Sequence, residues 1–84
     1  MPHFYFHVFN GSGETRDEEG VDLPDLAAAI DRATSGIRSI LCDELSRGLL
    51  DFGGMIRVTD EQGRMLIEVP FETAVELRLA NRYV

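Results

Sequence analysis

The sequence contains no lysine and no tryptophan, and its 84 residues include one cysteine. All eight basic residues are arginines, and fifteen Asp and Glu residues bring the net charge to −7. Binding to the phosphates of nucleic acids or to an anionic membrane requires a basic patch, so we expect neither kind of partner. The single thiol, Cys42, cannot form an internal disulfide, which is typical of a reducing compartment.

Long apolar runs are also missing. The longest, Leu26–Ile30, has five residues, whereas a membrane span needs roughly 20. The opening residues 1–4 show no cationic region followed by an apolar segment, so no secretory signal is expected. We therefore expect a soluble, cytoplasmic protein, and its length predicts one domain over residues 1–84.

The N-terminal segment His3–Phe9 is rich in aromatic and β-favouring residues, which predicts a strand. Alternation places its side chains on two opposite faces. The core face carries Phe4, Phe6 and Val8, and the outer face carries His3, Tyr5, His7 and Phe9. The turn residues 10–13 then favour a hairpin, with a short return strand at residues 14–16.

Acidity is concentrated just before the one long helix. Residues 14–25 contain six acids and one arginine. At the end of this stretch Asp22 is suited to cap a helix and Pro24 to occupy its first turn. We expect the helix to run to about Arg47, with Gly48 at the C′ position.

The predicted helix has two distinct faces at about 100° per residue. An apolar stripe for the sheet comprises Leu26, Ile30, Ala33, Ile37, Ile40 and Leu41. A ridge of small side chains on the opposite face comprises Ala28, Ser35, Ser39, Cys42 and Ser46. Because Glu44 falls on the apolar stripe, we expect the last turn to lift off the sheet or to fray.

A second hairpin follows, formed by strands at Met55–Thr59 and Met65–Val69. A two-residue turn at Gln62–Gly63 keeps apolar residues on one face. The resulting cross-strand pairs are Val58 with Ile67, Ile56 with Val69, and Arg57 with Glu68 as an ion pair.

The remaining residues suggest one more helix. Pro70 ends the strand, and Phe71–Arg82 is expected to form a short helix with Phe71, Ala74, Val75 and Leu79 on one side. The order of elements is a strand, an optional second strand, a helix, two strands and a terminal helix. This predicts the α+β class, with a small antiparallel sheet of three to four strands and one long helix packed on one face.

His3, Tyr5 and His7 share a strand face, which invites a metal or acid–base interpretation. At about 3.3 Å per residue the two imidazoles are anchored roughly 13 Å apart, too far to share one ion with ligands near ~2 Å. The acidic stretch also fails as a calcium loop: counted from Asp17, the positions that require Gly and Glu hold Asp22 and Ala28.

Cys42 lies in mid-helix beside Asp43, where nearby acids discourage thiolate formation. The sequence contains no nucleophile elbow, phosphate loop, Cys-x-x-Cys or zinc-protease motif. We therefore predict no catalytic residue, no cofactor and no metal ion.

Three groups of residues form the candidate interaction surface. They are His3, Tyr5 and His7 on the strand, Asp17, Glu18 and Glu19 in the acidic stretch, and Ser35, Ser39 and Cys42 on the helix. They favour a non-catalytic protein–protein interaction or regulatory module that can form a homodimer and whose partner has a basic surface. The sequence leaves one alternative open: a small-molecule binder or enzyme that uses a shallow His/Tyr/acid groove on the N-terminal strand.

Several segments together also resemble a known group. They are the opening Met-Pro-His-Phe-Tyr-Phe-His, the Asp-Glu-Glu-Gly before the helix, and Val-Pro-Phe at residues 69–71. In these the chain resembles a family of short bacterial proteins of unknown function, over most of its length up to Phe71. The resemblance implies a bacterial domain that stands alone, and it supplies no activity, ligand or site.

Overall fold

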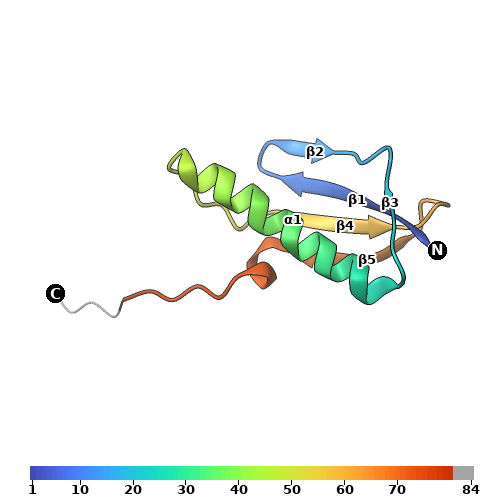
Figure 1. The fold of residues 1–84 in the computed structure, drawn as a ribbon. Helices are drawn as coiled ribbons and strands as arrows, with labels where there is room; N and C mark the ends of the chain where they lie inside the picture. The colour runs from blue at the N-terminus through green and yellow to red at the C-terminus, as the bar shows by residue number, and fades with distance from the viewer. Residues whose placement is uncertain (81–84) are drawn as a thin grey trace.

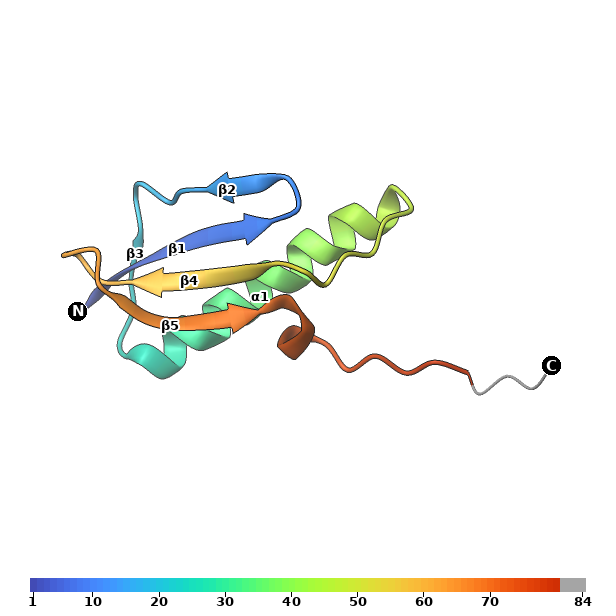
Figure 2. The same ribbon diagram turned by 180° about the vertical axis from the view of Figure 1, so that it is seen from behind.

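The computed structural model describes residues 1–80 as one antiparallel sheet with a helix laid across one face (Figures 1 and 2). The elements are β1 (His3–Asn10), β2 (Gly13–Thr15), β3 (Val21–Asp22), α1 (Leu26–Ser46), β4 (Met55–Thr59), β5 (Met65–Pro70) and the 3-10 helix η1 (Phe71–Ala74). The strand order is β2-β1-β4-β5, and β3 pairs with the N-terminal end of β1. The predicted α+β class is confirmed, although the sheet has five strands and not three or four.

β1 is the central strand of the N-terminal half. Its predicted core face is confirmed, because Phe4 is buried and Phe6 and Val8 pack against the core. The return strand β2 forms one residue earlier than expected and pairs antiparallel with β1. The two-residue strand β3, which sets Asp22 opposite His3, was not predicted.

The N-cap of α1 is Asp25, not Asp22 as expected. The Asp25 side chain accepts a hydrogen bond from the Ala28 N–H at 2.9 Å, and Pro24 therefore precedes the cap. Asp22 is not free to cap the helix because its backbone pairs with β1 and its carboxylate contacts His3.

The C-terminus of α1 is closed and does not fray. Gly48 has a φ of 85° and donates to the Leu45 carbonyl, while the Leu49 N–H donates to the Glu44 carbonyl. These two bonds form a Schellman motif, with Gly48 at C′ as predicted. Leu41 is the last buried residue of α1, and residues 42, 43, 45 and 46 are exposed while Glu44 is half-buried, so of the two expected outcomes only the fraying is wrong.

The core lies between α1 and the sheet. Its helical side chains are Ala29, Ala33, Ile37 and Leu41, and its strand side chains include Phe4, Ile56, Val58 and Val69. Leu26 and Ile30 belong to the same predicted stripe, yet Leu26 is 39% exposed and Ile30 is half-buried. The reason is visible in Figures 1 and 2, where the first turns of α1 extend past β5, beyond the edge of the sheet.

The hairpin of β4 and β5 has the predicted pairs Ile56–Val69, Arg57–Glu68 and Val58–Ile67. Its predicted two-residue turn is wrong. Asp60 and Arg64 are joined by a backbone hydrogen bond, which leaves a three-residue loop with Gly63 at φ 80°. A register shift between Val58 and Thr59 absorbs the extra residue, so the apolar residues stay on one face despite the longer loop.

The predicted helix Phe71–Arg82 is reduced to the single turn η1. Phe71 and Ala74 are each 1% exposed, and Arg38 Nε on α1 donates to the Ala74 carbonyl at 2.7 Å. Val75 is extended (φ −137°, ψ 155°) and Leu79 is 81% exposed, so the helix does not continue. The last residues of the predicted helix, 81–82, lie outside the described residues. Within residues 1–80, no helix combines the length and the apolar composition that crossing a membrane would require.

Candidate functional site

The acidic loop (residues 16–20) connects β2 to β3 and lies against β1. Around it the fold brings together six of the nine predicted surface residues: His3, Tyr5, His7, Asp17, Glu18 and Glu19. The other three, Ser35, Ser39 and Cys42, are exposed on the face of α1 that points away from the sheet. The nine predicted residues therefore lie on two separate surfaces. Only on the first, around the acidic loop, do titratable side chains contact one another.

Asp17 fastens the acidic loop to β1. Its Oδ2 accepts from the Phe6 N–H at 3.0 Å, and its Oδ1 accepts from the N–H groups of Glu19 and Gly20 at 3.2 and 3.1 Å. Burial by itself would raise the pKa of Asp17, but the three backbone donors outweigh it and lower the pKa below 3.8. Asp17 is thus an ionised carboxylate that is used internally.

His3 holds the other end of the loop. Its Nδ1 lies 2.5 Å from Asp22 Oδ1, and its Nε2 lies 2.7 Å from the Glu19 carbonyl oxygen. Both neighbours are acceptors, so only an imidazolium, which donates from both nitrogens, satisfies them. The bond to Asp22, followed by the bond to Glu19, raises the pKa of His3 above 6.5.

Gly20 makes the His3 contact possible. Its φ is +68°, and a Cβ at this position would lie 2.7 Å from both His3 Nε2 and the Phe4 carbonyl oxygen. A side chain would meet backbone as well as the ring, so the position requires glycine. The Asp-Glu-Glu-Gly sequence before the helix therefore has a physical basis in this contact.

His7 is engaged through both ring nitrogens as well. Nδ1 accepts from the Asp17 N–H at 3.1 Å, which leaves the proton on Nε2 to be donated to Thr59 Oγ1, also at 3.1 Å. Tyr5 lies between the two histidines, with its ring centroid 5.1 Å from that of His3 and 6.4 Å from that of His7. The three rings thus form a continuous row along β1.

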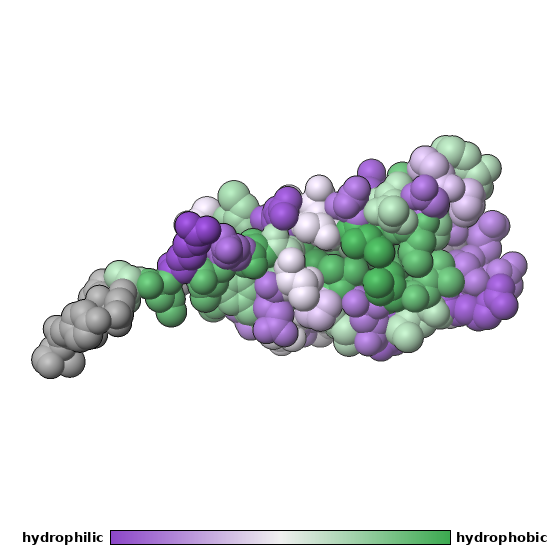
Figure 3. Space-filling view, turned by 90° about the horizontal axis from the view of Figure 1, so that it is seen from below, coloured by the Kyte–Doolittle hydropathy of each residue, from purple (hydrophilic) through white to green (hydrophobic). Residues whose placement is uncertain are grey.

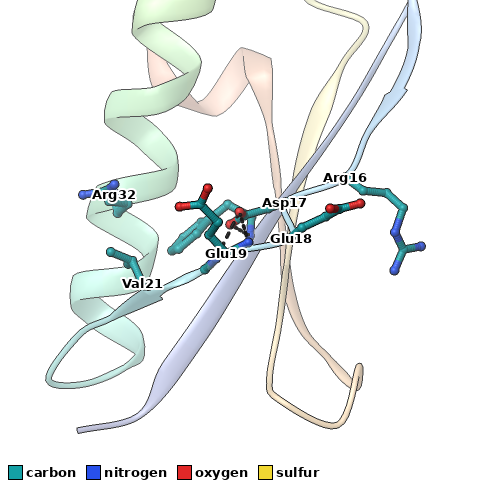
Figure 4. A pocket seen from close by; sticks show the side chains of 8 residues that line it. Arg16, Asp17, Glu18, Glu19, Val21 and Arg32 are labelled. Atoms are coloured by element: carbon teal, nitrogen blue, oxygen red, sulfur yellow. Dashed lines mark hydrogen bonds between the residues drawn. The ribbon is translucent and has the colours of Figure 1, made fainter.

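Glu18 and Glu19 are the exposed acids of the acidic loop. Figure 4 shows Asp17 turned inward to its hydrogen bonds, with Glu18 and Arg16 on one side of the loop and Glu19 facing the α1 side, where Arg32 lies. A hollow of about 480 Å³ lies on the α1 side of the loop, and another of about 320 Å³ lies on the side of Tyr5 and His7. The loop therefore forms a narrow acidic ridge between two open hollows.

The histidines and Asp17 of the site are bound within the protein. No group of three or more His, Cys, Asp or Glu within residues 1–80 is arranged to hold a metal ion. The nitrogens of His3 and His7 and the oxygens of Asp17 already have partners in the protein. These side chains hold the loop in place, which is a positional role.

Arg57, Glu68 and Phe9, farther along the outer sheet face, also contact one another. The predicted ion pair between Arg57 and Glu68 is confirmed, with both Nε and Nη2 of Arg57 donating to Glu68 Oε2. The same guanidinium lies 4.7 Å from the centre of the Phe9 ring, a cation–π contact. Phe9, which the sequence analysis placed on the outer face, is thus partly covered by Arg57.

Sequence reasoning missed three residues of the site. Asp22 was assigned to the helix cap, Thr59 was treated as a generic strand residue, and Gly20 entered only as the last residue of the Asp-Glu-Glu-Gly motif, with no structural role. Asp22 and Thr59 reach the histidines through contacts across 19 and 52 residues of sequence. Gly20 alone had a local signal, because glycine is the usual residue where the backbone takes a left-handed conformation.

A family model described as Domain of unknown function (DUF6894) matches residues 3–72. The match spans all five strands, α1 and the acidic loop, and it ends within η1, before the extended residues 75–80. No curated protein and no solved structure matches the chain.

Proposed function

We propose that this chain, a member of the DUF6894 family, is a non-catalytic protein–protein interaction module that presents its acidic loop to a basic surface of a partner protein. The observation that carries this proposal is the difference between neighbouring residues of the loop. The side chains of Asp17 and the two histidines form the hydrogen bonds that hold the loop on β1, whereas the side chains of Glu18 and Glu19 are exposed.

Fixing the loop favours binding because an ordered loop loses little conformational entropy when a partner docks. Charge makes a second contribution. Residues 14–25 carry six acids and one arginine, and a local field of one sign speeds encounter with a partner of the opposite sign. Among the described residues, Glu18 and Glu19 have no ion pair that a partner would need to displace.

The alternative function, a small-molecule binder or enzyme, has less support. The hollows beside the loop are open, and the groups that would perform acid–base chemistry already have hydrogen-bond partners inside the protein. A ligand that used His3 or His7 would first have to break the contacts that hold the loop.

The test is affinity capture by the full chain from an extract of the cells that encode it. We compare the wild type, the variant Glu18→Gln/Glu19→Gln, and a matched control, Asp31→Asn/Glu72→Gln, which removes two exposed acids elsewhere. We expect the wild type and the control to retain the same partner. The loop variant should lose it, because both exposed charges of the loop are gone.

Salt gives the second arm of the test. Between about 0.1 M and about 1 M salt the Debye length falls from about 10 Å to about 3 Å, so a partner held by the loop should elute. Capture that is identical for all three proteins, or that resists salt, would overturn the proposal.

A further inference from the structure

The residues after η1 alternate between apolar and charged side chains, as in a β-strand, but they pair with no strand among residues 1–80. Val75, Leu77 and Leu79 alternate with Glu76 and Arg78. Arg78 Nη2 donates to Glu76 Oε2 at 2.8 Å, so these two side chains lie on the same side of the extended chain. Leu77 and Leu79, on the other side, are 56% and 81% exposed. Exposed leucines in such a row indicate a surface that packs against something.

The sheet has a free edge of matching length. β5 is the last strand in the order β2-β1-β4-β5, and no other strand among residues 1–80 pairs with its outer side. It has six residues, as does the segment 75–80, or roughly 20 Å of extended chain each. Natural edge strands are commonly protected by charged side chains and proline. β5 has Glu68 and Pro70 in its second half, but its first half exposes Met65 (54%) and Leu66 (41%).

The apolar surface beside this edge is unfinished. Figure 3, seen from the β5 side, shows a continuous apolar area on the body of the molecule. The first turns of α1 extend past β5, which leaves Leu26 and Ile30 of the core stripe without a strand opposite them. One more strand beside β5, with apolar residues facing α1, would lie over these turns and complete the layer.

We propose that residues 75–80 of one copy add as a sixth strand to the free edge of β5 in a second copy, and that the exchange is reciprocal. Leu77 and Leu79 face α1 of the second copy, Val75 stays packed against the core of its own copy, and Glu76 and Arg78 lie on the outer face.

The direction of the chain supports a second copy as the occupant. In Figure 2 the segment 75–80 leaves η1 and continues in the direction in which β5 points. A two-fold axis perpendicular to that direction reverses the partner, so each segment runs antiparallel to the β5 that it meets. Such a contact is isologous and closes at two copies, and main-chain pairing at an exposed edge is a known mode of recognition.

Folding back onto the same chain is disfavoured by the anchoring of η1. Phe71 and Ala74 are buried, and Arg38 holds the Ala74 carbonyl, so the segment begins in the helix layer and heads away from its own β5 edge. This interface is separate from the acidic loop, which lies at the opposite side of the sheet (Figure 1).

The first experiment measures mass by sedimentation equilibrium on the full chain over a range of concentrations. We expect twice the 9.4 kDa of one chain. The variant Leu77→Asp/Leu79→Asp should weaken the dimer by at least about 100-fold, a typical loss when central apolar anchors are removed. The control Leu50→Asp, at a leucine that is 47% exposed elsewhere, should leave the dimer intact.

The second experiment identifies the contact and does not depend on the exact register. A spin label is attached at Arg78→Cys in a Cys42→Ser background, and this protein is mixed with an isotope-labelled copy that lacks the label. We expect amide signals of residues 65–70 in the isotope-labelled copy to broaden, because only a second molecule can bring the label there. A label at Leu50→Cys serves as the control and should not broaden them.

Three results would overturn the proposal: a monomer at every concentration, equal loss of the dimer in the Leu50 variant, or no broadening of residues 65–70. Each would leave the acidic-loop proposal standing, since that test uses different residues.

Discussion

Two rings fasten the chain at opposite ends of β1, and each is seated against a glycine. At one end, a Cβ on Gly20 would lie 2.7 Å from His3 Nε2. At the other end, a Cβ on Gly54 would lie 2.7 Å from Phe71 Cε2. The two contacts are alike in shape but differ in chemistry.

Phe71 is 1% exposed and packs in the apolar core, whereas the His3 side chain is 27% exposed and is held by Asp22 and the Glu19 carbonyl. Apolar burial does not change with pH, but a hydrogen-bonded imidazolium does. We therefore expect one end of β1 to be a fixed anchor and the other, beside the acidic loop, to respond to pH.

The largest expected effect breaks the apolar anchor. Phe71→Ala should lower the free energy of unfolding by about 3–5 kcal/mol, because it removes a buried ring and leaves a cavity. Denaturant unfolding measures the loss, which should be the same at pH 5 and pH 8. The exposed control Leu50→Ala should change stability by less than about 0.5 kcal/mol. If Phe71→Ala lowers the free energy of unfolding by no more than the Leu50→Ala control does, the anchor is weak.

The second prediction compares the two glycines directly. Gly54→Ala should cost about 1–3 kcal/mol through overpacking against Phe71. Gly20→Ala should cost about 1–2 kcal/mol from its left-handed conformation alone, and it must also displace His3. Unfolding gives both losses, and an NMR titration separates them, because only Gly20→Ala should lower the pKa of His3. If Gly54→Ala changed the pKa of His3 as much as Gly20→Ala does, the two ends of β1 would not differ in the way described.

The third prediction tests the carboxylate that fixes the loop. Asp17→Asn should cost about 1–2 kcal/mol near neutral pH, because an amide cannot accept from all three backbone donors. The folded pKa of Asp17 is lowered, so its contribution is fully present above pH 3.8 and is lost as the pH falls through that lowered value. The difference between wild type and variant should therefore shrink in acid. Glu18→Gln, its exposed neighbour, should have almost no effect.

The smallest effect concerns the titration of His3. NMR should place its pKa above 6.5, and Asp22→Asn should lower it by removing the strongest hydrogen bond. Because the folded pKa is raised, His3 contributes stability that is fully present below pH 6.5 and is lost as the pH rises through the folded pKa. The control Asp31→Asn should leave the titration unchanged. A His3 pKa at or below 6.5 would remove the pH response from this end of β1.

Features set by local periodicity were predictable from the sequence. Alternation placed Phe4, Phe6 and Val8 in the core, and it fixed the pairs Ile56–Val69 and Arg57–Glu68. The hairpin loop was not predictable in the same way. The loop has three residues where two were predicted, and the register shift at Thr59 absorbs the extra one. The alternation of apolar and polar residues along the strands is therefore the same for a two-residue and a three-residue loop.

The remaining errors occurred where one pattern fits two structures. Val75 and Leu79 are spaced for a helix, but Val75, Leu77 and Leu79 are also spaced for a strand. Asp22 and Asp25 are both good caps, and tertiary contact with His3 decides between them. The site depended on the same kind of contact, since Asp22 and Thr59 meet the histidines only in the folded chain.

The exposed Cys42 on α1 has a practical consequence. It is the single thiol in the chain, and the outward face of the helix carries it away from both the sheet and the core. A fluorophore attached there would report on the whole protein without any substitution. Quenching or energy transfer from this one position can then follow docking at the acidic loop and assembly at the β5 edge in the same sample.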